Sequence, residues 1–353
     1  MWSPLHYWHP VLKSADVGRS PVEQIVAGTP LVFYRTRDGA VAALENRCSH
    51  RRMPLHHGVL DGDRIVCPYH ACSFAPDGSG RCPTSGSRAL SVRSYETRED
   101  HGVVWVREAG SDSAFPTIER EGWTFVGSVE HVIDGPLQLV VDNMTELEHT
   151  GAVHRMLAFG IDDLTSVRTR ADRHGDMIRI SYEGPQRPLS VAFRSAFDVR
   201  EGDTYRQDAE IHADPVHSRY TIHWHDPVDD TARRFAMRFV IFYVPTTAES
   251  TKMYTFAHWS VPKGRWLGLY DRLVGAEFMR TVRYELGQDK AIIEKLPYEE
   301  MDIRRFKLGP FDRPMALTRA LLAERYWGTA DAPGEAGAGA AGPTPLPATG
   351  TGD

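Results

Sequence analysis

The sequence has little of what marks a secreted, membrane-bound or nucleic-acid-binding protein. Its four cysteines all lie between positions 48 and 82, so no disulfide framework spreads over the chain. No apolar run reaches the ~18 residues of a membrane-spanning helix, and the N-terminus lacks the apolar stretch of a signal peptide. The net charge of −6 gives no reason to expect a nucleic acid or an anionic membrane as partner. We therefore expect a cytoplasmic protein.

The composition is that of an ordinary globular protein, and the length predicts about two domains. Hydrophobic residues at 41% of the chain suffice for sizeable cores. Residues 1–110 contain short β-branched or aromatic runs bounded by turn residues, which predict a small all-β domain. We expect a linker at 111–130 and a second domain at 131–327. The Ala-, Gly-, Pro- and Thr-rich stretch 328–353 predicts a disordered tail.

Two short motifs bring together cysteine and histidine side chains. Cys48-x-His50 is followed after 16 residues by Cys67-x-x-His70, a ligand set that suits a structural zinc ion or a Rieske [2Fe–2S] cluster. Zinc sites usually pair like with like, as C-x2-C and H-x3-H. Here each motif offers one Cys and one His, so each motif can supply one ligand to each of the two irons of a [2Fe–2S] cluster. With Phe74 the stretch resembles the Rieske signature C-x-H…C-P-x-H-x-x-x-F, and we predict a [2Fe–2S] cluster.

A second group of polar residues opens the C-terminal part. Residues 142–154 read as one helix that begins with Asp142 or Asn143 near its cap. His149 and His154 are five residues apart, which places them ~140° apart on a regular helix. A break or a π-type bulge at the glycine between them would bring them together. Taken alone, the pair reads equally well as two incidental histidines on a polar face, because His-x4-His is a weak motif.

A distant carboxylate would complete a metal site with these histidines. The chain is expected to be helical from about 262, and a further helix is predicted from about Arg280 to Leu296, with Asp289 inside it. An exposed Asp-Lys pair is the commoner explanation for that aspartate. Two histidines and one carboxylate, however, form the facial triad of non-haem Fe(II) oxygenases, which leaves coordination positions for O₂, water or substrate.

Together the two groups resemble the Rieske non-haem iron oxygenases, most closely the compact group that includes vanillate O-demethylase and dicamba monooxygenase. The family pattern N-x-x-D-x-x-H-x-x-x-x-H matches Asn143, Glu146, His149 and His154, and its third iron ligand matches Asp289. The resemblance covers roughly residues 5–325. It implies an α+β chain, in which an N-terminal all-β Rieske domain precedes a helix-grip (START-like) catalytic domain.

The resemblance also implies a function, that of the terminal oxygenase component of a monooxygenase. Such a protein uses O₂ and electrons from NAD(P)H, delivered by a flavin reductase with or without a ferredoxin, to hydroxylate or oxidatively demethylate a small aromatic or heterocyclic substrate. It implies a mononuclear Fe(II) on His149, His154 and Asp289. His70 would pass the electron through Glu146 of a neighbouring subunit in a head-to-tail homotrimer. Oxidative cyclisation or desaturation, a plain electron carrier and a zinc-stabilised binding protein are the alternatives.

Two departures from the family pattern stand out. Glu146 replaces the usual aspartate, which keeps the carboxylate but lengthens its side chain by one methylene. Ala71-Cys72 replaces Gly-Trp after the second Rieske histidine, and the loss of that tryptophan could shift the cluster potential. We interpret Cys72 as a packed or tolerated thiol rather than a fifth ligand.

The substrate pocket is expected between strands in the range 175–260. In one of them Tyr220, Ile222 and Trp224 alternate with His223 and His225, which we expect to face solvent. Aromatic residues elsewhere in the range could line the pocket, although most such residues are core: Phe193, Phe197, Phe239 and Tyr243. Four further histidines lack a spacing partner and are interpreted as surface or loop residues: His6, His9, His56 and His57.

Overall fold

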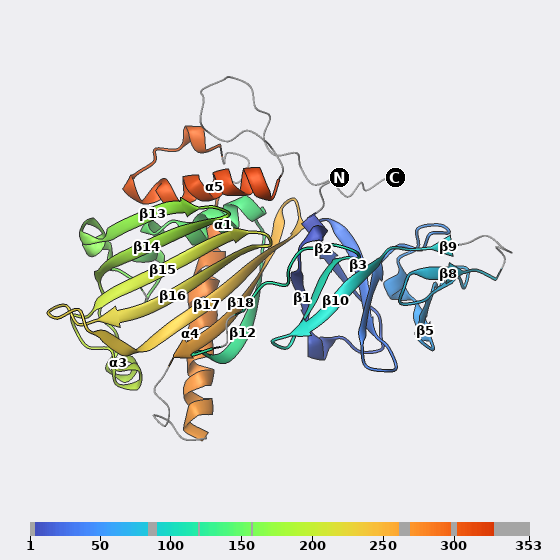
Figure 1. The fold of residues 1–353 in the computed structure, drawn as a ribbon, viewed down its shortest axis with the longest axis horizontal. Coiled ribbons are helices and arrows are strands. Elements are labelled where there is room, and N and C mark those ends of the chain that lie inside the picture. Colours follow the sequence, from blue (N-terminus) through green and yellow to red (C-terminus); the bar gives the residue numbers. More distant parts are fainter. Residues whose placement is uncertain are drawn as a thin grey trace. The chain divides into compact units, whose positions relative to one another are not determined.

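The computed structural model describes residues 4–83, 90–118, 121–156, 158–260, 269–297 and 302–327 (Figure 1). The chain divides into two compact units, with the main boundary after Pro116. The tail expected at 328–353 lies outside the described residues.

The N-terminal unit is built from two antiparallel sheets, as predicted for an all-β domain. One sheet has six strands in the order β1-β11-β10-β4-β3-β2 and the other has five in the order β5-β6-β7-β8-β9. The six are β1 His9–Lys13, β2 Val22–Val26, β3 Thr29–Arg35, β4 Val41–Glu45, β10 Ser94–Asp100 and β11 Val103–Glu108. The five are β5 Val59–Asp61, β6 Arg64–Val66, β7 Ser73–Phe74, β8 Ser79–Arg81 and β9 Leu90–Ser91. Short 3₁₀ turns are η1 Pro4–His6, η2 Ser14–Asp16 and η3 Leu55–His57.

The core of this unit includes one histidine that we expected at the surface. His9 is 1% exposed, and its Nε2 lies 2.8 Å from the carbonyl oxygen of Pro4. The expectation was wrong because a histidine whose ring nitrogen meets a backbone oxygen can be buried at little cost. His57, in contrast, is exposed.

The C-terminal unit is one seven-stranded antiparallel sheet with helices against it, which confirms the α+β class (Figure 1). Its strand order is β12-β18-β17-β16-β15-β14-β13. The strands are β12 Thr124–Ile133, β13 Arg168–His174, β14 Met177–Pro185, β15 Thr204–Ala213, β16 Val216–His225, β17 Ala232–Thr247 and β18 Ser250–Ser260. Because β12 begins at Thr124, residues 124–130 of the segment expected as a linker belong to this sheet.

Helices cover the sheet and carry the polar residues singled out above. They are α1 Leu137–Thr145, α2 Glu148–Val153, α3 Val191–Phe197, α4 Leu269–Ile293 and α5 Arg313–Arg325, with 3₁₀ turns η4 Ile161–Ser166, η6 Ile303–Arg305 and η7 Pro310–Asp312. α4 packs along β12, whereas α5 packs on α1 and on β13 and β14. Where two helices were predicted from about 262 to 296, the structure describes a single helix, α4. Residues 261–268 are not among the described residues. Within the described residues, no helix is long and apolar enough to cross a membrane.

Candidate functional site

The two histidines of the C-terminal unit come together because the predicted helix is broken. α1 ends at Thr145, Glu146 adopts an extended backbone, and a new helix, α2, starts at Glu148. His154 lies just beyond α2 with φ −77° and ψ 152°, so it no longer follows helical periodicity. The ring centroids of His149 and His154 are 5.2 Å apart.

The break corrects two expectations about this segment. Asp142 and Asn143 do not cap a helix but lie near the end of α1. The glycine between the histidines, Gly151, does not permit a bulge. A Cβ there would lie 3.2 Å from Cα of Ile161 and 3.3 Å from Cδ1 of Leu164, so this glycine lets α2 pack closely on η4.

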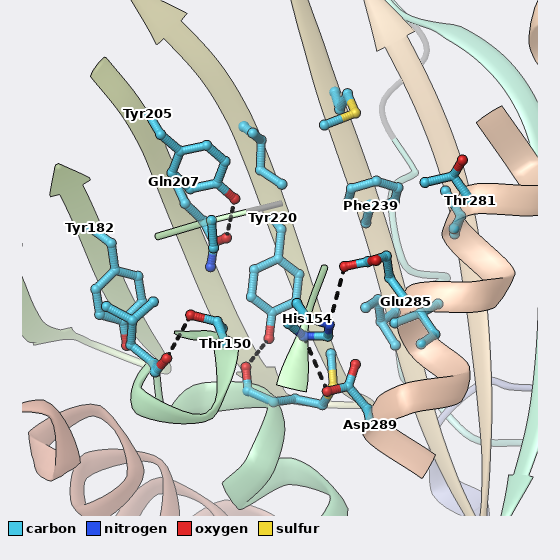
Figure 2. A pocket seen from close by; sticks show the side chains of 18 of the residues that line it. Thr150, His154, Tyr182, Tyr205, Gln207, Tyr220, Phe239, Thr281, Glu285 and Asp289 are labelled. Carbon is cyan, nitrogen blue, oxygen red and sulfur yellow. Dashed lines mark hydrogen bonds and ion pairs between the residues drawn. The ribbon is translucent and has the colours of Figure 1, made fainter. Parts of the chain in front are cut away.

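Three potential metal ligands converge on one point. Nε2 of His149 and Nε2 of His154 each lie 3.3 Å from Oδ1 of Asp289, and the three ligand atoms lie within 4.8 Å of one another. Asp289 comes from α4 and is 1% exposed, so it is not the exposed residue that an Asp-Lys pair usually indicates. Figure 2 shows His154 and Asp289 facing each other. Two imidazoles and one carboxylate fit a mononuclear iron(II) ion.

Neighbouring side chains fix the orientation of these three groups. Nδ1 of His149 donates to Oε1 of Glu146 at 2.5 Å, which directs Nε2 toward Asp289. Nδ2 of Asn143 donates to Oδ1 of Asp289 at 3.2 Å. Such partners commonly set the tautomer and position of metal ligands.

An ion pair that the sequence did not reveal holds α1 in place. Arg319 of α5 donates through Nε to both carboxylate oxygens of Asp142 at 3.0 Å. The Asp142 side chain is buried, and burial raises its pKa while Arg319 opposes that shift. The two residues are 177 positions apart, and no local pattern links them.

The electrostatics of the triad also suit a cation. Burial disfavours the charged form of His149, but Asp289 and Glu146 outweigh it and raise its pKa to about 9. For His154, burial is likewise outweighed by Asp289 and Glu285, which raise its pKa to about 9. Burial would raise the pKa of Asp289, but the two imidazoles hold it well below its usual range. A metal ion would take the place of the protons that these carboxylates attract.

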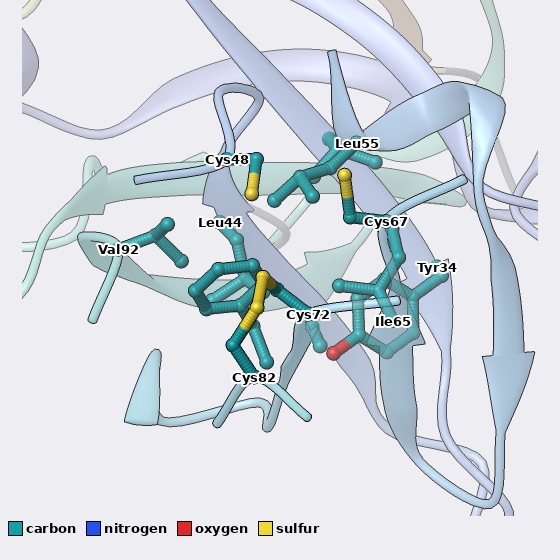
Figure 3. Close-up of a cluster of buried hydrophobic side chains, with 12 residues drawn as sticks. Tyr34, Leu44, Cys48, Leu55, Ile65, Cys67, Cys72, Cys82 and Val92 are labelled. Atoms are coloured by element: carbon teal, nitrogen blue, oxygen red, sulfur yellow. A yellow bond between two sulfur atoms is a disulfide. The ribbon is translucent and has the colours of Figure 1, made fainter. Parts of the chain in front are cut away.

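The N-terminal unit brings together the other predicted ligand set. Cys48 and Cys67 are buried thiols without a disulfide, and Figure 3 shows both sulfurs on the same side of a buried cluster. His50 is exposed, and its ring centroid lies 4.6 Å from that of the partly buried His70. Two inner thiolates and two outer imidazoles fit a Rieske cluster.

The loops that carry these four residues differ from each other. Cys67 and His70 lie between β6 and β7, which pair as a hairpin. Cys48 and His50 follow β4 of the larger sheet and precede β5 of the smaller one, so this loop joins two sheets and is not a hairpin tip. A hydrogen bond closes each loop, from Cys48 N to Met53 O at 2.9 Å and from Cys67 N to Cys72 O at 2.8 Å.

Cys72 is not the free thiol that we expected. It forms a disulfide with Cys82, and its Sγ lies 3.8 Å from Nδ1 of His50. The expectation failed because both cysteines are part of one buried cluster, shown in Figure 3. As disulfide sulfurs they offer no thiolate, which leaves Cys48 and Cys67 as the candidate thiol ligands.

A cavity of about 120 Å³ opens beside the triad, between the sheet and α4. Its lining is mostly aromatic and aliphatic: Met144, Leu147, Ala158, Tyr182, Phe193, Tyr205, Tyr220, Ile222, Met237, Phe239, Ile241, Phe278, Val282 and Leu286. Its polar residues are Glu146, His149, Thr150, His154, Gln207, Thr281, Glu285 and Asp289. Such a mainly apolar cavity with a few polar groups is typical of a small-molecule site.

Strand alternation identified part of this lining. Four of the candidate residues do line the cavity: Phe193, Tyr220, Ile222 and Phe239. Three others are buried but do not line it: Phe197, Trp224 and Tyr243. His225, expected in solvent, is 8% exposed, and its Nδ1 lies 3.0 Å from the backbone oxygen of Asp230. No motif or spacing in the sequence singled out Glu285.

Two tyrosines of the cavity wall bind the end of α1. The hydroxyl of Tyr182 donates to the backbone oxygen of Thr145 at 3.0 Å, and that of Tyr220 donates to the oxygen of Met144. Both carbonyls belong to the last turn of α1, where a helix leaves carbonyl groups without intrahelical partners. The wall therefore supports the turn that precedes Glu146.

Comparison with known proteins supports the same two-part organisation. Residues 7–96 match the Rieske [2Fe–2S] domain, and residues 133–324 match the vanillate O-demethylase oxygenase C-terminal domain. A dicamba O-demethylase oxygenase component from Stenotrophomonas maltophilia is 33% identical over 42% of this chain and 47% of its own length. A vanillate O-demethylase oxygenase subunit from a Pseudomonas strain is 26% identical over 43% of this chain and 45% of its own length.

The chain spans about half the length of these two curated relatives. A crystal structure of dicamba monooxygenase bound to 3,6-dichlorosalicylic acid superimposes with a TM-score of 0.76, covering 94% of this chain and all of the other at 19% identity. That likeness confirms the predicted fold.

Proposed function

The chain belongs to the vanillate O-demethylase oxygenase family, with a Rieske [2Fe–2S] domain ahead of the catalytic domain, and on that premise we propose that it is a terminal monooxygenase component. It uses O₂, and electrons from NAD(P)H supplied through a flavin reductase with or without a ferredoxin, to hydroxylate or oxidatively demethylate a small aromatic or heterocyclic molecule. The observation that carries this proposal is the convergence of His149, His154 and Asp289 beside a mainly apolar cavity.

The two ligand sets have separate roles in this proposal. The mononuclear iron supplies the activation of O₂, and the cluster supplies electrons. The cavity residues exclude water and hold the substrate next to the triad. The cluster ligands are Cys48, His50, Cys67 and His70, and the iron ligands are His149, His154 and Asp289.

We propose that Glu146 connects the candidate iron site to a neighbouring subunit. Its Oε2 accepts the backbone N–H of His149 at 3.3 Å, while Oε1 accepts Nδ1–H. Its side chain is 20% exposed, so the carboxylate is not sealed inside the protein while it holds the ring of His149. We assign it a contact with His70 of a neighbouring subunit in a head-to-tail homotrimer, a heterologous interface that closes into a ring.

Cytoplasmic location and the identity of the reductase stay predictions. A disulfide such as Cys72–Cys82 is uncommon in a reducing compartment, and free-thiol titration of protein from anaerobic lysates would show whether it forms in the cell. If Cys72 and Cys82 are free thiols in the cell and form the disulfide only after exposure to air, the result would support a cytoplasmic location.

A single-turnover assay tests the activity. Reduced, iron-loaded protein meets O₂ together with a panel of methoxyarenes, N-methyl heterocycles and polycyclic natural products, and products are identified by mass spectrometry. Gain of one oxygen or loss of a methylene confirms a monooxygenase. Loss of two hydrogens would show desaturation or cyclisation instead. Oxidation of the cluster with no change in any substrate would contradict the proposed activity on this panel.

A further inference from the structure

The cavity beside the triad has few polar side chains that are free to bind a substrate. Three hydroxyls of its wall donate to backbone oxygens of residues 144–147: Thr150 to Leu147, Tyr182 to Thr145 and Tyr220 to Met144. The acidic and histidine side chains contact one another in and around the triad. Among the described residues of the lining, this leaves the polar groups of Tyr205, Gln207 and Thr281.

Tyr205 and Gln207 form a hydrogen-bonded pair on β15. They are two residues apart, so both side chains point to the face of the sheet that forms the cavity wall. The hydroxyl of Tyr205 donates to Oε1 of Gln207 at 2.8 Å. Figure 2 shows this bond, with the amide nitrogen of Gln207 turned away from Tyr205. Within the described part of the chain, Nε2 of Gln207 makes no hydrogen bond.

The hydroxyl of Tyr205 determines which end of the amide faces the cavity. Tyr205 is 1% exposed, and burial raises its pKa, so the hydroxyl keeps its proton at neutral pH. If the amide were turned over, Nε2 would face this hydroxyl, and the hydroxyl proton would be buried without an acceptor. Oε1 of Gln207 therefore stays on Tyr205, and the N–H groups of Nε2 are left for a ligand in the cavity.

Thr281 does not discriminate between ligands in the same way. Its hydroxyl, on α4, can either donate or accept a hydrogen bond, so it suits both kinds of polar group. The free nitrogen of Gln207 can only donate. A ligand that fills the cavity and leaves this donor without an acceptor pays for its desolvation. Gln207 therefore favours a ligand that carries an acceptor atom.

The other lining residues favour a neutral acceptor over a carboxylate. Neither lysine nor arginine is among the described residues of the lining, whereas Glu146, Glu285 and Asp289 are. A substrate carboxylate would be buried there near acidic side chains and without a cation to pair with, which is unfavourable. A carbonyl oxygen carries no net charge and accepts from an amide N–H. The aromatic and aliphatic remainder of the lining suits the body of an arene.

Gln207 and the triad lie on opposite sides of the cavity. Gln207 belongs to the sheet, where its partners on the adjacent strands, Tyr182 and Ile222, also line the cavity. The triad comes from α2, the residue that follows it, and α4, and Figure 2 shows Asp289 on the helix side. A substrate whose acceptor is bound at Gln207 therefore directs its other end toward the triad.

We propose that Gln207 selects a neutral arene that carries a ketone or amide oxygen, by donating an N–H group of its side-chain amide to that oxygen. Tyr205 is a positioning residue, because it holds the amide in the donating orientation. This inference rests on the proposed function and specifies its substrate class. It concerns binding, so it can be tested without turnover.

Three methoxyarenes of similar shape test the donor. 4-Methoxyacetophenone has a carbonyl oxygen where 4-isopropenylanisole has a methylene group, and 4-methoxybenzoate has a carboxylate in this place. Calorimetry with the anaerobic, iron-loaded protein measures the affinity of each. We expect the ketone to bind about fivefold more tightly than the alkene, which is the usual effect of one net hydrogen bond. The benzoate should bind most weakly.

Variants on β15 show whether the preference comes from Gln207. Gln207→Met keeps the approximate length of the side chain and removes both N–H groups, so the ketone and the alkene should bind within about twofold of each other. Tyr205→Phe removes the hydroxyl that holds the amide, and the preference should fall part of the way. Asp208→Asn is the matched control, because Asp208 is exposed and points to the other face of the strand. It should keep the full preference.

A purely structural role of Gln207 predicts a different result. Gln207→Met would then weaken the binding of both neutral probes equally, and the persistence of their ratio would overturn the proposal. Equal affinities for the ketone and the alkene in the unaltered protein, tighter binding of the benzoate, or no binding of any probe would also overturn it. If Gln207→Met does not fold, Tyr205→Phe decides, because an undiminished ratio in that variant contradicts the proposal.

Turnover is measured separately from binding. Preferential binding of the ketone without any product in the reduced, oxygenated protein would count against the monooxygenase activity, while it would support the binding role of Gln207. Turnover of the ketone and the alkene with equal KM, both in the unaltered protein and in Gln207→Met, would count against Gln207 and would support the monooxygenase. The two failures are therefore distinct.

Discussion

Glu146 shows how much can depend on the length of one side chain. With one methylene more than the aspartate of the family pattern, it still reaches both Nδ1 and the backbone N–H of His149. The helix break at Glu146 accommodates the longer side chain because the residue lies outside regular helix. The carboxylate therefore keeps its contact with the iron ligand while part of it remains exposed.

Replacing Glu146 by glutamine keeps the size of the side chain and removes its charge. We expect Glu146→Gln to lower single-turnover rate ~10–100-fold, because partners of metal ligands commonly have effects of this size. Iron content and the cluster spectrum should not change. Glu148→Gln, at an exposed position two residues away, is the control and should match the unaltered protein. A Glu146→Gln variant with full activity would refute the assigned role.

Buried histidines make stability depend on pH. Burial lowers the pKa of His9 from 6.5 to about 4, partly opposed by the oxygen of Pro4, and burial lowers that of His217 to about 3. The unfolded chain takes up protons below pH 6.5, while the folded chain keeps both rings neutral to much lower pH. Stability is therefore full above pH 6.5 and is progressively lost as the pH falls toward 4.

Thermal unfolding between pH 8 and pH 4.5 measures this effect. For the iron-loaded protein, in which a metal ion would keep His149 and His154 from titrating, we expect Tm to be nearly constant above pH 7. It should fall below pH 6.5 by the equivalent of a few kcal/mol in total for His9 and His217. His9→Leu cannot titrate and should show a shallower fall, whereas His57→Asn, at an exposed position, should follow the unaltered protein. Identical slopes for His9→Leu and the unaltered protein would contradict the argument.

Spacing predicted the four cluster-ligand candidates, and the family resemblance supplied the three iron-ligand candidates; the structure brings the members of each set near one another. The Cys48-x-His50 and Cys67-x-x-His70 pairs are recognisable because few other sites require those residues at those intervals, whereas His149 and His154 are recognisable only through the family pattern. Burial is harder to predict, because it depends on partners that are distant in sequence. His9, His225 and Glu285 look like ordinary polar residues until the backbone and rings around them are known.

At the scale of elements, the sequence predicted a helix where two short helices stand with a break between them. The residues from Asp142 to His154 have no strong breaker at the position where α1 ends. Contacts from elsewhere favour the break, namely Tyr182 and Tyr220 on the last carbonyls and Arg319 on Asp142. Local propensity could not reveal these tertiary interactions, and it equally failed to show that α4 is continuous.

The ion pair between α5 and α1 should be important for stability. Arg319→Leu leaves the carboxylate of Asp142 buried without its counterion, and we expect a loss of ~3 kcal/mol in the free energy of unfolding. Urea denaturation followed by the signal of the C-terminal unit measures it. Adding Asp142→Asn to Arg319→Leu should recover part of that loss, because a neutral amide needs no counterion. No destabilisation by Arg319→Leu would mean that the pair adds little.

For the whole molecule, the sequence predicted the order of the two parts and their fold classes. The family motifs cover most of the chain, so the fold could be inferred from them. The extent of the linker was overestimated because β12 starts with exposed residues, and Thr124 and Phe125 are weakly apolar signals of a strand. An edge strand with little burial at one end resembles a loop in sequence.

Electron transfer between subunits can be tested by mixing two inactive variants. His70→Asn removes a proposed cluster ligand, and Asp289→Ala removes a proposed iron ligand. Co-expression in equal amounts should restore about a quarter of normal activity, because random head-to-tail assembly places an intact cluster next to an intact iron site at one interface in about four. Mixing the separately assembled variants without subunit exchange should restore none. Inactive co-assembled trimers would instead show that electrons move within one chain.

If Glu146 makes the proposed contact with a neighbouring subunit, the two tyrosine hydroxyls that bind the end of α1 link substrate binding to that contact. A molecule that shifts the ring of Tyr220 also acts on Met144, two residues before Glu146, because the hydroxyl holds the carbonyl of Met144. Thermodynamic linkage requires the reverse as well. If occupation of the cavity strengthens the contact made by Glu146, formation of that contact raises affinity for the occupant by the same factor. The assembled protein would then recognise its substrate more tightly than an isolated chain.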